Sequence, residues 1–205
     1  MVMLRKRVVH ERTKGGRLRA KIVREPVTHS KPQPRKRKKR NLKDSEHSQL
    51  CLLAKKWILK NGFGVAIDDR MKAACETGEQ PDAMGWNSSV SIVIEVKTSR
   101  SDFLADKNKK FRANPRLGMG DWRFYLCPKG LISKDEVPEG WGLLYYHEGK
   151  IRRVHGGPKS NGWSFDGIPF IGNKDCEMSY MYSALRRMVV RGHLESMYSM
   201  DGIKK

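Results

Sequence analysis

The sequence predicts a mixed α/β fold, in which a β-sheet is flanked by helices and preceded by a basic N-terminal extension. Three observations lead to this prediction. Basic residues concentrate in the first 40 positions, and apolar residues after them alternate between helical and strand-like spacing. The run "VSIVIEVK" is apolar and β-branched, as expected for a strand covered on both faces. With 205 residues, the chain has room for one domain and an appendage.

The first 40 residues carry most of the positive charge. They contain 16 Lys and Arg against 2 acidic residues, a net charge of +14 out of +20. The stretch "KPQPRKRKKR" lacks the apolar face that a helix on a lipid surface needs, so nucleic acid is the expected partner. We expect a flexible nucleic-acid-binding tail over residues 1–40 and a separate domain over residues 41–205. A solvated tail that serves solubility or localisation is the alternative. The expected contacts in the tail are Arg35, Lys36, Arg37, Lys38, Lys39 and Arg40.

Apolar runs and cysteines bear on the compartment. No apolar run reaches membrane-spanning length, and "MVMLRKR" lacks the apolar stretch of a signal peptide, so we expect a cytoplasmic protein without a membrane partner. The four cysteines are far apart, with no C-x-x-C pair and no histidine at zinc-ligand spacing. We therefore expect them to be reduced thiols of the core.

The predicted elements of the first half follow from spacing and caps. One short hairpin is expected around "RLRAKIVRE". "DSEHSQLCLLAKKWILKNG" predicts a helix that is capped by Asp44 or Ser45 and stopped by Gly62. "FGVAIDD" predicts a strand, residues 77–86 predict a shorter one, and "VSIVIEVK" gives the clearest strand pattern of the chain.

The second half continues in the same way. A polar helix is expected from about Ser101 to Arg112, and Pro115 ends it. "WRFYLC" predicts a buried strand, and "GLLYYHEGKIRRVH" predicts a hairpin that turns at Glu148 and Gly149. "DCEMSYMYSALRRMVVRG" predicts a closing amphipathic helix that stops at Gly192. This order of elements fits a mixed sheet with helices on its faces.

Charged residues at the end of the central strand point to a metal site. Side chains alternate along a strand, so Glu95 and Lys97 share a face. If the predicted strand that contains Asp82 pairs antiparallel with the central one, Asp82 returns toward Glu95. Two carboxylates repel unless a cation lies between them, and Mg²⁺ or Mn²⁺ takes oxygen ligands from carboxylates and carbonyls. Asp82, Glu95 and the Val96 carbonyl are the expected ligands, and Lys97 would orient the attacking water and stabilise negative charge.

These residues resemble a known signature. "PD" at Pro81–Asp82 followed by "EVK" at Glu95–Lys97 is similar to the PD-(D/E)XK motif of the restriction-endonuclease-like nucleases. The flanks "IEVKTSRSDFLADKNKKFR" and "DWRFYLCPKGLI" are similar to the MmcB-like DNA-repair family and related phage proteins. The resemblance implies a restriction-endonuclease-like fold in a bacterial or phage-encoded protein, with Asp82, Glu95, Lys97 and, on the preceding helix, Glu46 as catalytic residues.

Each of these residues also has a simpler interpretation. Glu46 can be an acid of a first helical turn, where the helix dipole favours it. Asp82 can be a turn residue after a proline. Glu95 and Lys97 can form a solvent-exposed salt bridge at a strand end.

Residues around the motif offer contacts to a phosphate backbone. Thr98, Ser99 and Ser101 lie where a helix is expected to begin. Basic residues follow them, and a solvated helix face is the alternative for each. We interpret Trp86, Trp122 and Trp141 as core residues and "GMGD" at 118–121 as a turn. The basic residues are Arg100, Lys107, Lys109, Lys110, Arg112 and Arg116.

The first functional hypothesis is a metal-dependent nuclease that hydrolyses phosphodiester bonds in DNA, in repair, recombination or phage DNA metabolism. The resemblance implies products with a 5′-phosphate and a 3′-hydroxyl, and DNA rather than RNA as the substrate. A second hypothesis is a DNA- or RNA-binding protein on the same fold without turnover. A third is an interaction protein that delivers nucleic acid to a repair or replication partner. Homodimerisation is compatible with all three.

Overall fold

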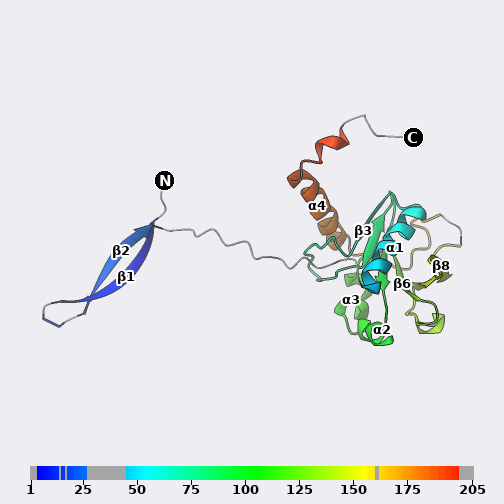
Figure 1. Ribbon diagram of the computed structural model, residues 1–205, viewed down its shortest axis with the longest axis horizontal. Helices are drawn as coiled ribbons and strands as arrows, with labels where there is room; N and C mark the ends of the chain where they lie inside the picture. Colours follow the sequence, from blue (N-terminus) through cyan, green and yellow to red (C-terminus); the bar gives the residue numbers. More distant parts are fainter. Residues whose placement is uncertain (1–3, 14, 17, 27–44, 160–161, 199–205) are drawn as a thin grey trace. The chain divides into compact units, whose positions relative to one another are not determined.

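The computed structural model describes residues 4–13, 15–16, 18–26, 45–159 and 162–198, and it separates into the units Met1–Arg40 and Asn41–Lys205 (Figure 1). In the first unit, β1 (Leu4–Arg12) and β2 (Leu18–Pro26) pair antiparallel from Leu4↔Pro26 to Arg12↔Leu18. The hairpin is therefore longer than the one expected around "RLRAKIVRE". The expected contacts at Arg35–Arg40 lie outside the described residues.

The second unit contains a six-stranded mixed sheet flanked by helices, which confirms the predicted fold class and is consistent with a restriction-endonuclease-like arrangement. The strands lie in sequence order, β3-β4-β5-β6-β7-β8. Only the pairs β5–β6 and β6–β7 are parallel in this described sheet. The strands are β3 (Val65–Asp68), β4 (Ala83–Trp86), β5 (Ser91–Val96), β6 (Trp122–Pro128), β7 (Trp141–His147) and β8 (Lys150–His155).

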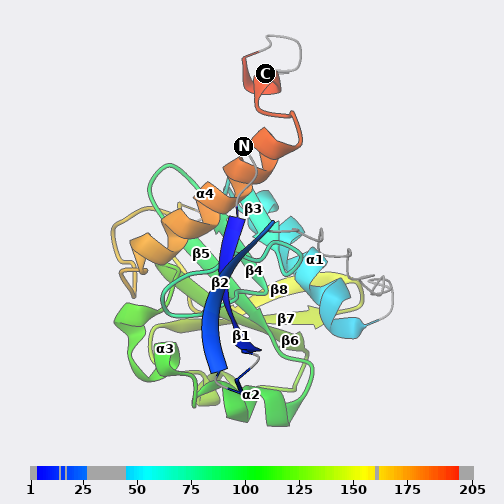
Figure 2. The ribbon, with the colours of Figure 1, turned by 90° about the vertical axis from the view of Figure 1, so that its left-hand side faces the viewer.

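The central strand β5 is buried along its whole length, as its apolar run predicts. Ile92 and Ile94 pack on the face covered by α1 (Glu46–Lys60). Val93 packs on the other face, in a cluster with Tyr180 of α4 (Lys174–Val190). Figure 2 shows α1 and α4 on the two flanks of β3, β4 and β5. Alternation along β5 therefore sends Glu95 and Lys97 to the face opposite α1.

Side-chain caps define the two long helices. The Ser45 hydroxyl accepts a hydrogen bond from the Ser48 N–H at the start of α1, one of the two caps expected there. Asn173 accepts from the Cys176 N–H at the start of α4. Gly62 and Gly192, the two predicted stops, have φ of +92° and +72° just past the helix ends. None of the helices within the described ranges is both long and apolar enough to cross a bilayer.

The expected helix from Ser101 to Arg112 is interrupted, which corrects the prediction. It consists of α2 (Arg100–Asp106) and α3 (Lys110–Ala113), with a short 3₁₀ helix η1 (Pro115–Leu117) after it. The break turns the chain so that Lys109 and Arg112 both reach Asp106 at its start. Asp106 and its two cations therefore lie on both sides of the break.

The remaining elements agree with the expectations apart from their lengths. β4 is shorter than the predicted 77–86 strand, and residues 77–82 approach it as a loop. The β7–β8 hairpin turns at Glu148 and Gly149, with φ of +49° and +76°. Two further 3₁₀ helices, η2 (Lys134–Glu136) and η3 (Glu195–Met197), complete the unit. Trp122 and Trp141 are buried, and the four cysteines are free thiols, as expected.

Candidate functional site

Asp82 and Glu95 lie at the same end of the sheet, where β4 begins and β5 ends. β4 and β5 pair antiparallel with Ala83 opposite Ile94, so the register continued by one step sets Asp82 opposite Glu95. The Asp82 Oδ2 accepts a hydrogen bond from the Val96 N–H at 2.8 Å. This bond fixes the Asp82 carboxylate at the end of β5, where the strand ladder no longer binds that N–H.

The helical residue that reaches Asp82 is His47. Its Nε2 lies 3.4 Å from the Asp82 Oδ1, and its Nδ1 lies 3.5 Å from the Cys51 Sγ one turn further along α1. The hydrogen bond that the imidazole donates to Asp82 raises the pKa of His47 above its ordinary value, against the effect of burial. Glu46, the residue expected to contribute from this helix, is exposed at the first position of α1.

His47, Cys51 and Asp82 together form a group that can bind a metal ion, because one ligand atom of each lies within 4.8 Å of the others. Burial raises the pKa of the Cys51 thiol far above its ordinary value, so the sulfur stays protonated and is a poor ligand as it stands. The Cys51 sulfur instead contacts the Nδ1 atom of His47, so the Nε2 atom is directed toward Asp82. Such a contact orients an imidazole for its partner.

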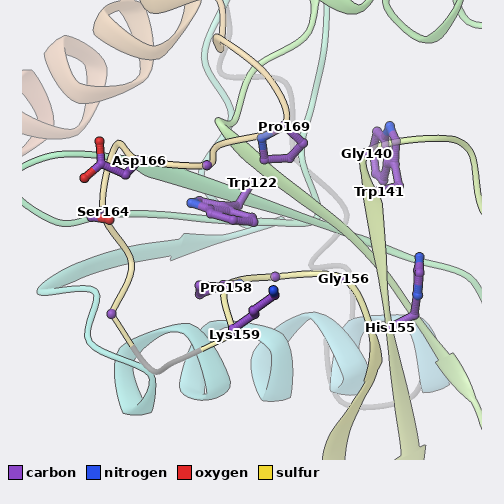
Figure 3. A pocket seen from close by; sticks show the side chains of 13 residues that line it. Trp122, Gly140, Trp141, His155, Gly156, Pro158, Lys159, Ser164, Asp166 and Pro169 are labelled. Atoms are coloured by element: carbon purple, nitrogen blue, oxygen red, sulfur yellow. The ribbon is translucent and has the colours of Figure 1, made fainter.

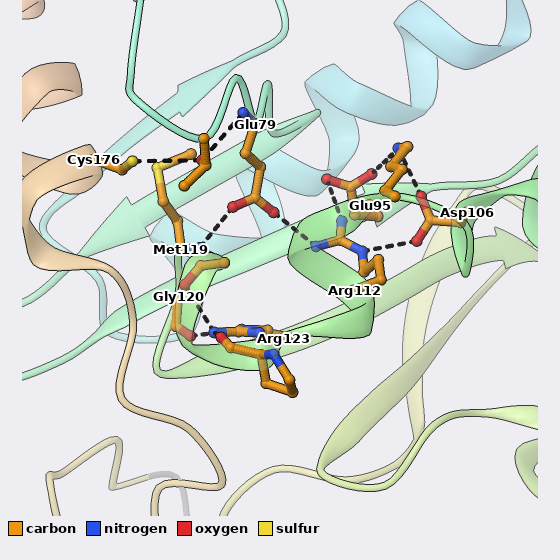
Figure 4. Close-up of polar contacts among 12 residues, drawn as sticks. Glu79, Glu95, Asp106, Arg112, Met119, Gly120, Arg123 and Cys176 are labelled. Atoms are coloured by element: carbon orange, nitrogen blue, oxygen red, sulfur yellow. Dashed lines mark hydrogen bonds and ion pairs between the residues drawn. The ribbon is translucent and has the colours of Figure 1, made fainter.

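Glu95 and Lys97 belong to a largely buried network of six charged side chains, which we call the ion network: Glu79, Glu95, Lys97, Asp106, Lys109 and Arg112. Figure 4 shows its acids Glu79, Glu95 and Asp106 around Arg112. The three carboxylates of the network face its three cations, and Lys97 also lies 3.8 Å from the partly exposed carboxylate of Asp102. The Lys97 Nζ lies 3.7 Å from Glu95 and 3.0 Å from Asp106. The Glu95 and Lys97 side chains are only 3% and 2% exposed, so their pair is not the solvent-exposed bridge of the simpler interpretation.

Arg112 connects the three acids of the ion network. Its guanidinium lies 2.7 Å from Glu79, 3.0 Å from Glu95 and 2.8 Å from Asp106, and it also stacks over the Trp141 ring. Burial alone would lower the pKa of Arg112, but the three carboxylates together raise it. Arg112 is therefore a buried ion-pair residue in this conformation rather than a surface contact for a phosphate backbone.

Burial and charge act in opposite directions on the carboxylates. Burial raises the pKa of Glu95 to about 7, with a contribution from the Asp82 charge and against the effects of Arg112 and the two lysines. Burial also acts to raise the pKa of Asp106, but Arg112, Lys109 and Lys97 hold it well below its ordinary value. Asp106 accepts a further hydrogen bond from the Tyr125 hydroxyl at 2.8 Å. Asp106 therefore stays ionised, while Glu95 is the acid that most readily takes up a proton.

The residues expected to contact a phosphate backbone have different environments. The Ser99 hydroxyl caps α2 by accepting from the Asp102 N–H, and it also lies 3.1 Å from the Ser101 hydroxyl. Thr98 is partly buried beside them. Arg100 forms a bidentate salt bridge with Glu136, with hydrogen bonds of 2.6 and 2.8 Å. Lys109 is 42% exposed but faces Glu95 and Asp106. The exposed basic side chains that remain are Lys107, Lys110 and Arg116.

Two buried polar groups on the same face of the sheet hold loops rather than a site. Glu177 accepts from the Ser91 hydroxyl and from the Gly120 N–H, and Lys174 caps the cluster. Arg123 donates to the carbonyls of Pro115, Gly118 and Gly120, and burial lowers its pKa to about 10. Both groups bind backbone of the segment 115–120. The segment consists of η1 and part of the turn expected at "GMGD" (118–121), and both groups hold it against the sheet.

A cavity of about 580 Å³ lies at the opposite end of the strands, where β6 and β7 begin (Figure 3). Trp122 and Trp141, the first residues of β6 and β7, line it together with His155 and Lys159. Glu95 lies near the far end of the parallel neighbour β5. This cavity therefore lies at the other end of the strands from Asp82, although its lining residue Trp141 also contacts Arg112 of the ion network.

Sequence reasoning missed His47, Glu79 and Asp106. His47 and Asp106 did carry a signal, because each is a polar residue on an apolar helix stripe: His47 precedes Leu50 by three positions, and Asp106 follows Phe103 by three. Glu79 is in a loop, and nothing in its sequence neighbourhood marks it as fully buried.

Comparison with known proteins leaves the function open. No protein-family model and no curated protein matches the chain. Among solved structures, a protein of unknown function from Silicibacter pomeroyi is similar, with 22% identity over 74% of this chain and 92% of that one. The TM-score is 0.45, which is too low for a functional argument.

Proposed function

We propose that the second unit is a metal-dependent nuclease that hydrolyses phosphodiester bonds in DNA. The observation that carries this proposal is the register of β4 and β5, which sets Asp82 opposite Glu95, with Lys97 on the same face of β5. This is the arrangement that the PD-(D/E)XK resemblance implies. Asp82, Glu95 and the Val96 carbonyl would hold the ion, and the ion would lower the pKa of a water and neutralise phosphate charge.

The contacts of Lys97 and Tyr125 support a role for each in this proposal. Lys97 is held by Asp106 and Glu95, so its ammonium is fixed beside the carboxylates and can stabilise negative charge on a phosphate. Tyr125 donates to Asp106 and keeps that acid in place. The network excludes water from Lys97, which strengthens its electrostatic effect on a bound phosphate.

The donor atoms fit a divalent cation and favour Mn²⁺ over Mg²⁺. Carboxylate oxygens suit both ions, but the His47 Nε2 adjacent to Asp82 is a nitrogen donor, which Mg²⁺ rarely accepts. We expect cleavage in both ions, with the higher rate in Mn²⁺, and a reduction of this preference in His47→Ala.

The test is cleavage of supercoiled plasmid, single-stranded DNA and branched DNA in Mg²⁺ or Mn²⁺. Wild type should cleave, whereas Asp82→Ala and Lys97→Ala should not. Because Lys97 is buried among acids, the folding of Lys97→Ala should be checked by circular dichroism, and Lys110→Ala serves as an exposed control. Activity that persists undiminished in Asp82→Ala and Lys97→Ala refutes the proposed site.

A non-catalytic DNA- or RNA-binding module is the second candidate. One observation favours it: both Glu95 oxygens face cations of the protein, with Arg112 at Oε1 and Lys97 and Lys109 at Oε2. An ion can join Glu95 only if one of these cations moves. Equal DNA binding by all variants without cleavage in either metal would support this candidate.

A further inference from the structure

A basic groove lies beside the candidate site, and none of its residues belongs to the expected nucleic-acid contacts. The groove encloses about 530 Å³. It lies between α1 and the last turns of α4, and Figures 1 and 2 both show β3 between these two helices. The charged residues and the histidine that line it are Lys55, Asp68, Arg70, Arg187, Arg191 and His193.

The charge of the groove is strongly positive. Four Lys or Arg side chains line it against one acid, Asp68, which is 3% exposed. Asp68 binds Arg70 through both oxygens, at 2.6 and 2.7 Å, and Lys55 lies 3.4 Å away. One buried carboxylate thus holds two cations in place, while the Arg70 and Lys55 side chains stay 50% and 32% exposed.

Two arginines of α4 keep their positive charge uncompensated. Arg187 donates to the Lys72 carbonyl at 2.6 Å and approaches the Met71 sulfur, both of which are neutral groups. Arg191, the C-cap of α4, is exposed. Neither arginine forms a salt bridge with any acid in the part of the chain that the structure describes. Such a concave surface with excess positive charge attracts a polyanion.

Asp68, which lines the groove, lies close to Asp82 along the sheet. β3 and β4 pair with Asp68 opposite Ala83, the residue that follows Asp82. A phosphate chain bound between Lys55 and Arg191 would therefore pass the strand ends that carry the candidate site. We infer that this groove binds the phosphate backbone of the DNA on one side of the cleaved bond. The choice of DNA as the polyanion rests on the proposed nuclease function.

The test measures the salt dependence of DNA binding by the full chain, with EDTA present so that no cleavage occurs. Fluorescence anisotropy of a labelled duplex is followed between about 50 and 200 mM KCl. Lys55→Gln with Arg191→Gln removes two groove charges. The matched control, Lys56→Gln with Arg186→Gln, removes two exposed charges from the same helices outside the groove.

Each phosphate contact contributes about 0.9 to the magnitude of the slope of log K against log salt concentration. The slope should therefore decrease in magnitude by about 1.8 in the groove variant and by almost nothing in the control. Arg191→Gln alone should lose about 0.9, and it keeps the test valid if the double variant folds poorly. Equal slopes for the groove variant and the control would overturn the inference. Because binding is measured without metal, a failure of the nuclease proposal would appear separately, as absent cleavage with an intact groove effect.

Discussion

Removal of the Arg112 guanidinium is the most direct test of the ion network. Arg112→Met keeps the volume of the aliphatic part of the side chain, but Glu79, Glu95 and Asp106 lose a cation at 2.7–3.0 Å. Removing one partner of a buried ion pair costs about 3–5 kcal/mol, because a charge is left uncompensated in a medium of low dielectric. Lys97 and Lys109 still face two of the acids, but Glu79 keeps only the Met119 N–H at 2.6 Å.

This cost is large compared with the stability of a domain. Folded domains have free energies of unfolding of about 5–15 kcal/mol, and in a chain of this size 1 kcal/mol shifts Tm by about 2–4 °C. We therefore expect Tm to fall by roughly 6–20 °C in Arg112→Met. Thermal unfolding followed by tryptophan fluorescence measures the change in Tm. Trp141 is a suitable reporter, because the guanidinium lies 4.6 Å from its ring.

Three variants separate charge from packing. Arg116→Met removes an exposed arginine nearby and should change stability by no more than about 0.5 kcal/mol. Arg112→Lys keeps the charge but loses the planar fork, so an intermediate loss is expected. Glu79→Gln should restore part of the stability in the Arg112→Met background, since it removes one uncompensated charge. Equal stability of Arg112→Met and Arg116→Met would refute the reasoning.

Two further predictions concern packing and pH. A Cβ at Gly85 would collide with the Ile58 side chain and lie 2.9 Å from the Val65 carbonyl oxygen. Gly85→Ala should therefore destabilise the fold by about 1–3 kcal/mol in thermal unfolding. Gly64→Ala is the control, because its Cβ meets open space and the change should be nearly neutral. Because the cations hold the pKa of Asp106 below its ordinary 3.8, its stabilisation is present above that pH and is lost as pH falls. Asp106→Asn should therefore lower Tm at neutral pH and flatten its decline between about pH 5 and 2; an equally steep decline in the variant would contradict this.

Much of the fold follows from local pattern, and the site does so only in part. The apolar run of β5 predicted a strand buried on both faces. A cap marked the start of α1, and glycines marked the ends of both long helices to within about two residues. The antiparallel pairing of β4 with β5 is the condition under which Asp82 was expected to return toward Glu95. Asp82, Glu95 and Lys97 were therefore placed near one another by short-range geometry. Their catalytic role stays a prediction.

The sequence by itself determined where strands and helices form, because these depend on the spacing of apolar residues and on caps a few positions away. Only the tertiary structure decided which charges meet. Arg112 binds Glu79 from 33 positions away, His47 rather than Glu46 reaches Asp82, and Arg191 lines the same groove as Lys55. No local pattern records these contacts, since the energy of a buried ion pair depends on distance and burial, and both are defined only once the sheet and its covering helices have packed together.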